Sequence, residues 1–534
     1  MINTTRRAVI VGGGLIGLGS LAGCGTGSSD GRDGRGTLVI GFSPEPATLT
    51  SATTTAGPTQ SVSSKIFDGL VTFDAAFNPQ PQLATGWTAA DDHLSLTLKL
   101  RSGVKWHDGK PFTSEDVAYS LTEVWKKLHA RGRSTFANVV AVDTPDPLTA
   151  ILRFSKPVPY LISALGAAES QVIPKHIYAG KDVLSNPANL APIGTGPFQF
   201  VEWERGQHIS LERNPDYWDR GRPGLDRIIY RIFADSNAAS AALETGEVHL
   251  VTSGQVPLSD IKRLSTLPAM RLYKRPSGFT AGVAVFEFNL DKPVFRDPRV
   301  RQAFAHAIDK DFIRDKIWYG FGTVAESPIP RELGTFNNPN VTTYPFDLKK
   351  AADLLDAAGF RPDAQGIRLR ITHDAAPTGD MLARSAGYIR DSLRRIGVDM
   401  QLRSSDFASF LKRVYTDRDF DTLQYAASAG PDPAIGTQRF YWSKNYQPGV
   451  AFSNGAHYVN PKVDALLEQA QIEPDPIRRK ALYDLFQTIV EQDLPRIPLI
   501  SAAVVTIASA RVQGFPDTAY GTLDNFSGVS LAPA

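Results

Sequence analysis

The sequence predicts an α/β protein, because strand and helix patterns are interspersed along the chain from Thr37 to its end. Its 534 residues correspond to roughly three to four domain-sized units. Hydrophobic residues make up 42% and charged residues 21% of the chain, which is ordinary for a folded protein. From Thr37 onward no apolar run is long enough to cross a membrane and no segment is of low complexity.

The charge balance and the cysteine count exclude several functional classes. Lys and Arg number 57 against 55 Asp and Glu, so the formal charge of +2 provides no basic field for a nucleic acid. The single cysteine, Cys24, allows neither an internal disulfide nor a cysteine-rich metal site. The nine histidines form no H-x-x-x-H pair. We therefore predict no nucleic acid partner, no metal and no cofactor.

Residues 1–23 are predicted to form an export signal. Arg6-Arg7 precedes a short, glycine-rich apolar run and resembles a twin-arginine export motif, although the ordinary secretory route remains an alternative. Leu21-Ala-Gly-Cys24 resembles the lipobox of bacterial lipoproteins, in which the cysteine thiol is acylated. The Gly-, Ser- and Asp-rich residues 24–36 are predicted to be a flexible linker. This pattern predicts an exported protein that a lipid on Cys24 holds at the outer face of the cytoplasmic membrane.

The same segment contains a competing pattern. Gly12-x-Gly14-x-x-Gly17 follows a strand-like run and satisfies the dinucleotide-binding fingerprint. That fold requires a helix, a second strand and an acidic residue about 20 positions later. The polar linker stands in their place. A nucleotide-dependent oxidoreductase is thus the alternative from another class, and the glycines are better explained as part of the signal.

Short strands are predicted throughout the rest of the chain. Leu94–Leu100 alternates apolar and polar side chains without a break, which indicates a half-buried strand. Further strand-like runs are Leu38–Phe42, Ile228–Phe233, Val283–Phe288, Leu369–Thr372 and Ile497–Ile500.

Three helices are predicted with their boundaries or apolar faces. Thr113 caps the first with Asp116 as its capping-box partner, and Trp125 lies in its apolar stripe as a core residue. Asp347 caps the second, Leu348–Ala358, and Gly359 stops it. The third has an apolar side formed by Ile477, Ala481, Leu482, Leu485 and Ile489.

No segment specifies a reaction. The chain contains neither G-x-S-x-G nor G-x-x-x-x-G-K-[ST], so the nucleophile elbow and the P-loop are missing. His107 beside a turn and His306 in a helical pattern are predicted to be structural. An exported α/β chain of this size without catalytic motifs is predicted to bind a ligand rather than to be an enzyme.

Several segments together resemble the extracytoplasmic solute-binding proteins of ABC importers, in the large peptide, nickel and oligosaccharide class. The segments are Leu100–Val117, Gly194-Thr-Gly-Pro-Phe198, Asn214-Pro-Asp-Tyr-Trp218, Leu243–Leu250 and Asp297–Asp309. They occur in the family's order over essentially all of residues 37–530. The resemblance is specific for the family and unspecific for the ligand.

The resemblance implies a two-lobe fold of the periplasmic-binding-protein type. Lobe I would comprise residues 37–278 with an inserted subdomain, lobe II residues 279–494, and residues 495–534 would return to lobe I. The ligand would lie in a cleft that closes at a hinge, and ABC permease subunits would recognise the closed monomer. An oligopeptide is the leading ligand; an oligosaccharide or another small polar solute is the alternative. A third alternative is a lipoprotein of the same fold that has lost transport and serves as a sensor or assembly partner.

The resemblance also places candidate ligand contacts around an Asp-Pro step. In peptide binders of the family, an acidic residue a few positions before this step captures the peptide's amino group. Here Ala426–Ala429, which includes Ser428, occupies that stretch, so Asp432 is the substitute candidate. Tyr425 and Ser428 in the same segment are also candidates.

The remaining candidates are spread along the chain. Arg439 is expected to pair with a ligand carboxylate, and aromatic side chains beside it to stack on a sugar or an apolar group. The full set outside the Asp-Pro segment is Glu45, Phe288, Asn289, Arg439, Tyr441 and Trp442. Nickel is disfavoured because no clustered His or Cys offers soft ligands.

Overall fold

The computed structural model describes residues 36–129, 131–252, 254–275 and 282–533. The predicted signal peptide, Cys24, the linker up to residue 35 and the G-x-G-x-x-G glycines lie outside the described residues, as does the predicted lobe boundary at 278/279. Within the described ranges, no helix combines the length and the apolar character that a membrane span requires.

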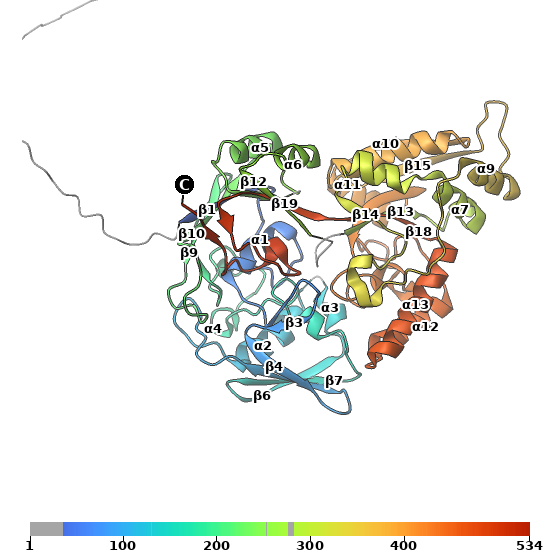
Figure 1. Cartoon of the computed structure of the whole chain (residues 1–534). Coiled ribbons are helices and arrows are strands. Elements are labelled where there is room, and N and C mark those ends of the chain that lie inside the picture. The colour runs from blue at the N-terminus through green and yellow to red at the C-terminus, as the bar shows by residue number, and fades with distance from the viewer. Residues whose placement is uncertain (1–35, 130, 253, 276–281, 534) are drawn as a thin grey trace, which may run out of the picture. The chain divides into compact units, whose positions relative to one another are not determined.

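A seven-stranded sheet forms the centre of lobe I (Figure 1). In spatial order its strands are β12 (Met270–Arg275), β19 (Val504–Ser509), β11 (Leu250–Thr252), β1 (Thr37–Phe42), β10 (Arg227–Ile232), β9 (His208–Arg213) and β8 (Phe198–Glu204). β1 runs parallel to β10 and β11, and the other pairs are antiparallel. The strands predicted at Leu38–Phe42 and Ile228–Phe233 are therefore confirmed, and they are neighbours in the sheet.

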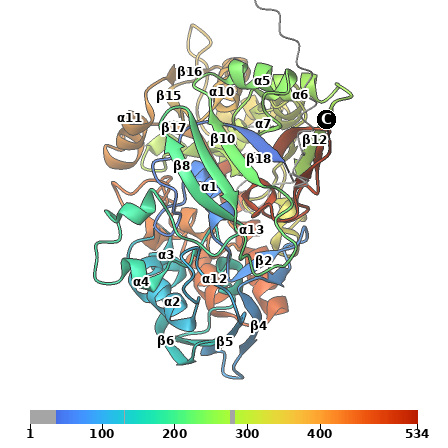
Figure 2. The ribbon, with the colours of Figure 1, turned by 90° about the vertical axis from the view of Figure 1, so that its left-hand side faces the viewer.

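A four-stranded antiparallel sheet is inserted in the chain between β1 and β8, and Figure 2 shows it below the seven-stranded sheet. Its order is β4 (Ala84–Ala89), β5 (Ser95–Leu100), β7 (Thr149–Phe154) and β6 (Val139–Asp146). Leu96, Leu98 and Leu100 on β5 are buried as predicted, whereas Leu94 is exposed and precedes the strand. Two small pairs complete lobe I: β2 (Val71–Phe73) with β3 (Pro79–Pro81), and β20 (Val512–Gln513) with β21 (Ser530–Leu531).

A six-stranded sheet forms lobe II. Its order is β14 (Gly322–Val324), β18 (Arg496–Ala502), β13 (Gly282–Phe288), β17 (Thr422–Ser428), β15 (Leu369–Ala375) and β16 (Val398–Arg403). β18 pairs with β13 and β14, whereas the next strand, β19, pairs with β11 and β12 of lobe I. The chain thus returns to lobe I between Ala502 and Val504. The predicted boundary at 494/495 is too early, because an apolar strand pattern does not reveal which sheet the strand joins.

Helices cover the sheets of both lobes (Figure 1). In lobe I they are α1 (Gly57–Ile66), α2 (Ser114–Tyr119), α3 (Gly132–Thr135), α4 (Lys175–Tyr178), α5 (Ser236–Glu244) and α6 (Leu258–Leu264). In lobe II they are α7 (Pro298–Ala307), α8 (Lys310–Phe312), α9 (Leu348–Ala357), α10 (Asp380–Arg394), α11 (Phe407–Leu411), α12 (Pro461–Ile472) and α13 (Pro476–Asp493). The capping box of Thr113 with Asp116 and the cap of Asp347 on α9 are confirmed.

Two apolar stripes predicted from sequence have different outcomes. Trp125 is fully buried, and its Nε1 donates to the Gln171 carbonyl at 2.8 Å, so it is a core residue as predicted. On α13, by contrast, Ile477 is 80% and Leu485 56% exposed. The buried side of α13 consists of Arg479, Tyr483, Phe486, Gln487, Val490 and Glu491. The prediction that Ile477 and Leu485 mark the core-facing side is wrong.

Segments that carried the family resemblance meet in lobe I. The Nδ1 of His107 accepts from the Gly194 amide at 3.2 Å, and its Nε2 lies 3.0 Å from the Gly196 carbonyl. Burial lowers the pKa of His107 to about 4, so the ring is neutral at pH 7 and can accept at Nδ1. Asn214 donates to the same Gly196 carbonyl at 3.0 Å. His107 therefore has the structural role that its sequence context predicts.

The backbone around Gly194 leaves no room for a side chain. A Cβ at this position would lie 1.8 Å from the carbonyl oxygen of Ile66. We expect Gly194→Ala to lower the free energy of unfolding by about 1–3 kcal/mol through overpacking. Gly387→Ala on α10, where no atom lies within 4 Å, is the matched control and should be neutral or stabilising. Equal urea midpoints for wild type and Gly194→Ala would contradict this account.

Candidate ligand-binding site between the lobes

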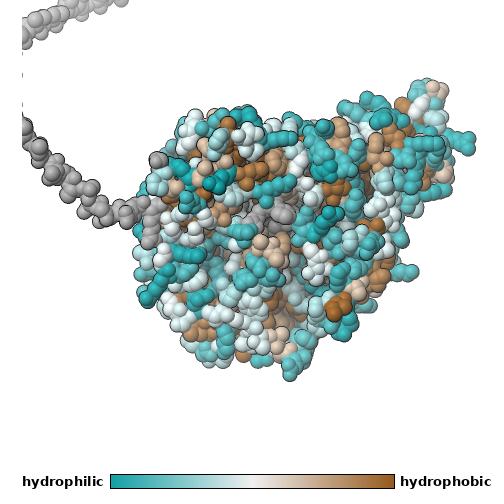
Figure 3. Space-filling model, viewed as in Figure 1, coloured by the Kyte–Doolittle hydropathy of each residue, from teal (hydrophilic) through white to brown (hydrophobic). Residues whose placement is uncertain are grey.

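A pocket of about 510 Å³ lies between the two lobes. Ser43, Asp235 and Gln255 line it from lobe I, and Tyr319 and Arg384 from lobe II. Ala502 and Ala503, where the chain crosses between the sheets, also border it. Because both lobes supply its walls, a change in the angle between them changes its shape. Figure 3 shows hydrophilic side chains spread over both lobes, with apolar ones interspersed among them.

One strand of lobe II has an edge close to this pocket that no other strand covers. β17 pairs with β13 along its whole length, but β15 pairs only with Thr422–Gln424. From Tyr425 to Ala427, the side of β17 toward β15 has no strand partner among the described residues, and we call this stretch the open edge of β17. Ala426, in this stretch, lines the interlobe pocket. An extended backbone could add to such an edge by main-chain hydrogen bonds, which do not depend on side-chain identity.

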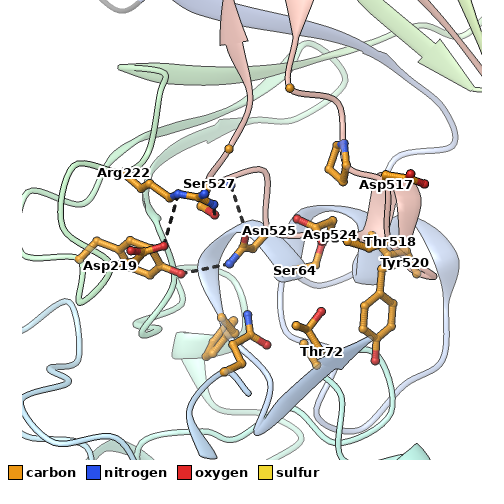
Figure 4. A pocket seen from close by; sticks show the side chains of 18 of the residues that line it. Ser64, Thr72, Asp219, Arg222, Asp517, Thr518, Tyr520, Asp524, Asn525 and Ser527 are labelled. Carbon is orange, nitrogen blue, oxygen red and sulfur yellow. Dashed lines mark hydrogen bonds and ion pairs between the residues drawn. The ribbon is translucent and has the colours of Figure 1, made fainter. Parts of the chain in front are cut away.

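A second pocket, of about 470 Å³, lies wholly within lobe I (Figure 4). The polar side chains that line it bind one another: Arg222 donates to Ser527 at 3.3 Å and pairs with Asp219 at 3.4 Å. Asn525 donates to the buried Asp68 at 2.9 Å. Since movement of the lobes would not form this pocket, the interlobe pocket is the better candidate for a ligand site.

Lys65, behind the lobe I pocket, makes stability depend on pH. Its Nζ is buried and donates to the Thr522 carbonyl at 2.7 Å. Burial lowers the pKa of Lys65 from 10.5 to about 7, and nearby Asp524 partly opposes this effect. Above pH 7 the folded state releases this proton while the unfolded state keeps it up to about pH 10.5. The contribution of Lys65 to the free energy of unfolding therefore rises with pH in this window.

We expect Lys65→Met to remove this dependence. Between pH 7 and 9, the free energy of unfolding of wild type minus that of Lys65→Met should rise by up to about 1.4 kcal/mol per pH unit. Urea unfolding of both proteins at pH 7, 8 and 9 measures the difference, which cancels the groups that the two share. If the free energies of unfolding of the two proteins changed with pH in parallel, the pKa of Lys65 would be the same in the folded and unfolded states.

Asp432 is occupied by another residue of the chain. Its carboxylate accepts two hydrogen bonds from Arg479 of α13, at 2.6 and 2.7 Å, and caps the Ala434 amide at 2.9 Å. Both side chains of the ion pair are at most 5% exposed. The carboxylate is therefore not available as the ligand's ammonium anchor, and the expectation that it substitutes for the family's acidic residue is corrected.

Most of the other predicted contacts serve the core of lobe II. Phe288 is fully buried and packs on Phe295 at 5.1 Å between ring centroids. Asn289 is buried and donates to the Phe420 carbonyl at 2.9 Å. Tyr441 is buried against Phe486. Phe288, Asn289 and Tyr441 are thus packing residues in this structure, not pocket residues.

Three further predicted residues make local bonds at partly exposed or buried positions. Trp442 is partly exposed, and its Nε1 donates to Glu468 at 2.9 Å. Glu45 accepts from Trp203 Nε1 at 2.8 Å, so it braces the β8–β9 hairpin of lobe I. Tyr425 donates to the buried Glu287 at 2.8 Å. Ser428, by contrast, is the last residue of β17 and directly follows the open edge of that strand.

Charged residues that sequence reasoning missed lie near Arg439. Glu169 of lobe I pairs with Arg131. Glu287 of β13 pairs with Arg496 of β18 at 2.7 Å, and both are buried. A glutamate inside the apolar run Val283–Phe288 was the one available sequence signal. The guanidinium of Arg439 forms no hydrogen bond or ion pair with any described residue, and its Nε is buried.

The two lobes touch around these groups. Glu169 of lobe I is close enough to Arg439 of lobe II for the guanidinium to oppose the burial that raises the glutamate's pKa. Ile435, which follows the Asp-Pro step, packs in the hydrophobic cluster of lobe I. The structure therefore brings Arg439 to the interlobe boundary, whereas the other predicted contacts named above remain inside their own lobes or on strand β17.

Two α/β lobes that share crossing strands and enclose a pocket define the class of two-lobe solute-binding proteins. A model of the bacterial extracellular solute-binding proteins, family 5 (middle region), matches residues 78–448. The chain belongs to this family. Family 5 is a class of extracytoplasmic transport binding proteins that bind small ligands and work with the permease subunits of ABC importers.

Named relatives and a solved structure agree with this assignment. An ABC transporter peptide-binding protein of Brucella abortus is 30% identical over 468 residues, 84% of each chain. The glutathione-binding protein GsiB of Escherichia coli is 26% identical over 476 residues, 87% of this chain and 89% of the relative. The structure of DppA from Helicobacter pylori in complex with the peptide STSA superposes with a TM-score of 0.78 at 26% identity, covering 93% of this chain and 98% of that chain.

Proposed function

We propose that this protein captures oligopeptides in its interlobe cleft and delivers them to the permease of an ABC importer. The open edge of β17 beside the interlobe pocket carries the proposal, because it offers main-chain hydrogen bonds to any extended peptide. The peptide STSA in complex with the Helicobacter pylori protein and the name of the Brucella relative support this ligand class.

Native mass spectrometry tests the ligand class. Protein purified from its own cells should carry retained species whose masses and fragments are those of short peptides. A synthetic tripeptide pool should replace them, and calorimetric titration should give one site per chain. Retained oligosaccharides, or another polar solute with no response to the peptide pool, would overturn the peptide proposal in favour of that solute.

We further propose that the protein is exported and anchored by a lipid on Cys24, with residues 24–36 as the tether. The lipobox-like Leu21-Ala-Gly-Cys24 supports this proposal. β1 begins at Thr37, so residues 24–36 would separate the lipid from the two lobes.

Cys24→Ala is expected to move the protein from the membrane fraction to the soluble fraction of its host. Because residue 24 precedes the first strand, the thermal unfolding midpoint of the lobes should not change. Ala22→Ser, which keeps the cysteine, is the matched control. Native protein that retains Met1 and carries no lipid would contradict the anchoring proposal.

A further inference from the structure

Five charged side chains near the interlobe boundary form a group that we call the boundary charge cluster: Arg131, Glu169, Glu287, Arg439 and Arg496. Two guanidinium–carboxylate pairs, Arg131 with Glu169 and Arg496 with Glu287, account for four of them. Arg439 is the fifth, and its guanidinium has no hydrogen-bond or ion-pair partner among the described residues. With both carboxylates ionised, the cluster carries one net positive charge.

The electrostatic surroundings cannot remove this excess. Burial raises the pKa of both Glu169 and Glu287, and protonation of either would make the cluster more positive. Burial lowers the pKa of Arg439 to about 10, with repulsion from Arg131 as a further cause, so the guanidinium stays charged at neutral pH. An unpaired buried charge is costly unless a counter-ion arrives.

The geometry of Arg439 suits an anionic partner. The residue lies in the turn Gln438–Phe440 of lobe II, with its guanidinium carbon 4.5 Å from the Phe440 ring centroid. The guanidinium lies over this ring, and its buried Nε has no hydrogen-bond partner. A planar guanidinium with free donors binds a carboxylate by two parallel hydrogen bonds.

Beside Arg439, no carboxylate of the boundary charge cluster is without an arginine partner, whereas Asp235 and Asp380 line the interlobe pocket itself. Asp432 is bound by Arg479, and Ala426–Ala429 contributes no acidic side chain. The carboxylates of the boundary charge cluster are each paired with an arginine. A cationic group placed beside Arg439 would therefore add to an uncompensated positive charge.

We propose that Arg439 binds a carboxylate of the ligand and thereby favours anionic ligands, such as peptides with a free carboxyl terminus or an acidic side chain. This inference rests on the proposed function, since it names the end of a peptide ligand that Arg439, at the interlobe boundary, would recognise. It also gives the ligand a role in closure. Arg439 of lobe II and Arg131 of lobe I repel each other, and a bound carboxylate removes that repulsion.

The test compares two tripeptide pools of identical composition, one as free acids and one as carboxyl-terminal amides. Side chains in both pools are restricted to uncharged residues. Wild type should bind the free-acid pool about ten- to a hundredfold more tightly, as expected for a charge-assisted pair. Arg439→Gln should lose the preference, and Arg439→Lys should retain part of it. Arg370→Gln, at an exposed position of β15, is the control and should behave as wild type.

The outcomes separate this inference from the proposed function. Equal binding of both pools by folded wild type would overturn carboxylate recognition and leave peptide capture intact. If wild type binds neither pool, the proposal of peptide capture is wrong. Carboxylate binding by Arg439 is then tested with glutarate, a small dicarboxylate that is not a peptide. At equal ionic strength, glutarate should raise the thermal midpoint of wild type but not of Arg439→Gln, whereas glutaramide should affect neither. No response of wild type to glutarate would overturn the inference. If Arg439→Gln does not fold, Arg439→Lys, which keeps the positive charge, provides the second variant for the same comparison.

Discussion

Replacing Asp432 with asparagine is expected to lower the free energy of unfolding by about 3–5 kcal/mol, because Arg479 is then left buried without a counter-charge. Urea unfolding followed by tryptophan fluorescence measures the loss. Asp417→Asn is the matched control: it breaks an ion pair with Lys412 whose side chains are 42% and 68% exposed, and its effect should be small.

The same variant separates a structural role from a ligand anchor. If Asp432 held a ligand ammonium, Asp432→Asn would weaken peptides with a free amino terminus and spare N-acetylated ones. Because its carboxylate is bound by Arg479, we expect any loss of affinity to be equal for both peptide forms. Unchanged stability together with a selective loss for free amino termini would contradict the structure.

Arg496→Met is expected to have a comparably large effect, again about 3–5 kcal/mol, because it strands Glu287 in the core of lobe II. Arg496 lies on β18 and Glu287 on β13, and the two residues are paired across these neighbouring strands. The guanidinium also stacks on Phe440 at 4.5 Å, so the substitution removes packing as well as charge.

A double-mutant cycle distinguishes a lost charge pair from a lost side chain. Glu287→Leu combined with Arg496→Met removes both charges, and an apolar replacement of a buried pair is often close to neutral. The double variant should therefore be more stable than Arg496→Met alone. Additive losses from the two single variants would contradict strong coupling between the two residues.

Much of the fold could be predicted from periodicity. Alternating side chains located β5, and apolar runs located β1, β10, β13, β15 and β18, because burial on a sheet leaves a local pattern in sequence. Capping residues located the starts of α2 and α9, since the orphan amide groups of a first turn select particular side chains. These features depend on neighbours only a few residues apart.

The errors arose where partners are distant in sequence. Ile477 and Leu485 of the predicted stripe on α13 face solvent. The buried side of the helix holds Arg479, whose partner Asp432 lies 47 positions away. The same distance hid the true role of Asp432. The lobe to which β18 belongs depends on its pairing with β13, which a strand pattern alone does not encode.

The candidate site was predictable only in part. An arginine at position 439, shortly after the Asp-Pro step, suggested a carboxylate partner. In the structure its guanidinium lies at the interlobe boundary and forms no ion pair with a described residue. Phe288, Asn289 and Tyr441 had the right residue types for a binding cleft but are buried in lobe II. Residue type indicates what a side chain can bind, whereas its burial depends on the assembled core.

Small-angle X-ray scattering tests most directly the central claim that the two lobes close around a peptide. Wild-type protein freed of retained ligand should be measured alone and with a saturating tripeptide pool. A ligand that bridges the lobes should lower the radius of gyration and raise the thermal midpoint by mass action. Closure by peptide predicts both changes in wild type. A radius of gyration that stays constant at saturating peptide, with binding verified by calorimetry in the same sample, would contradict it.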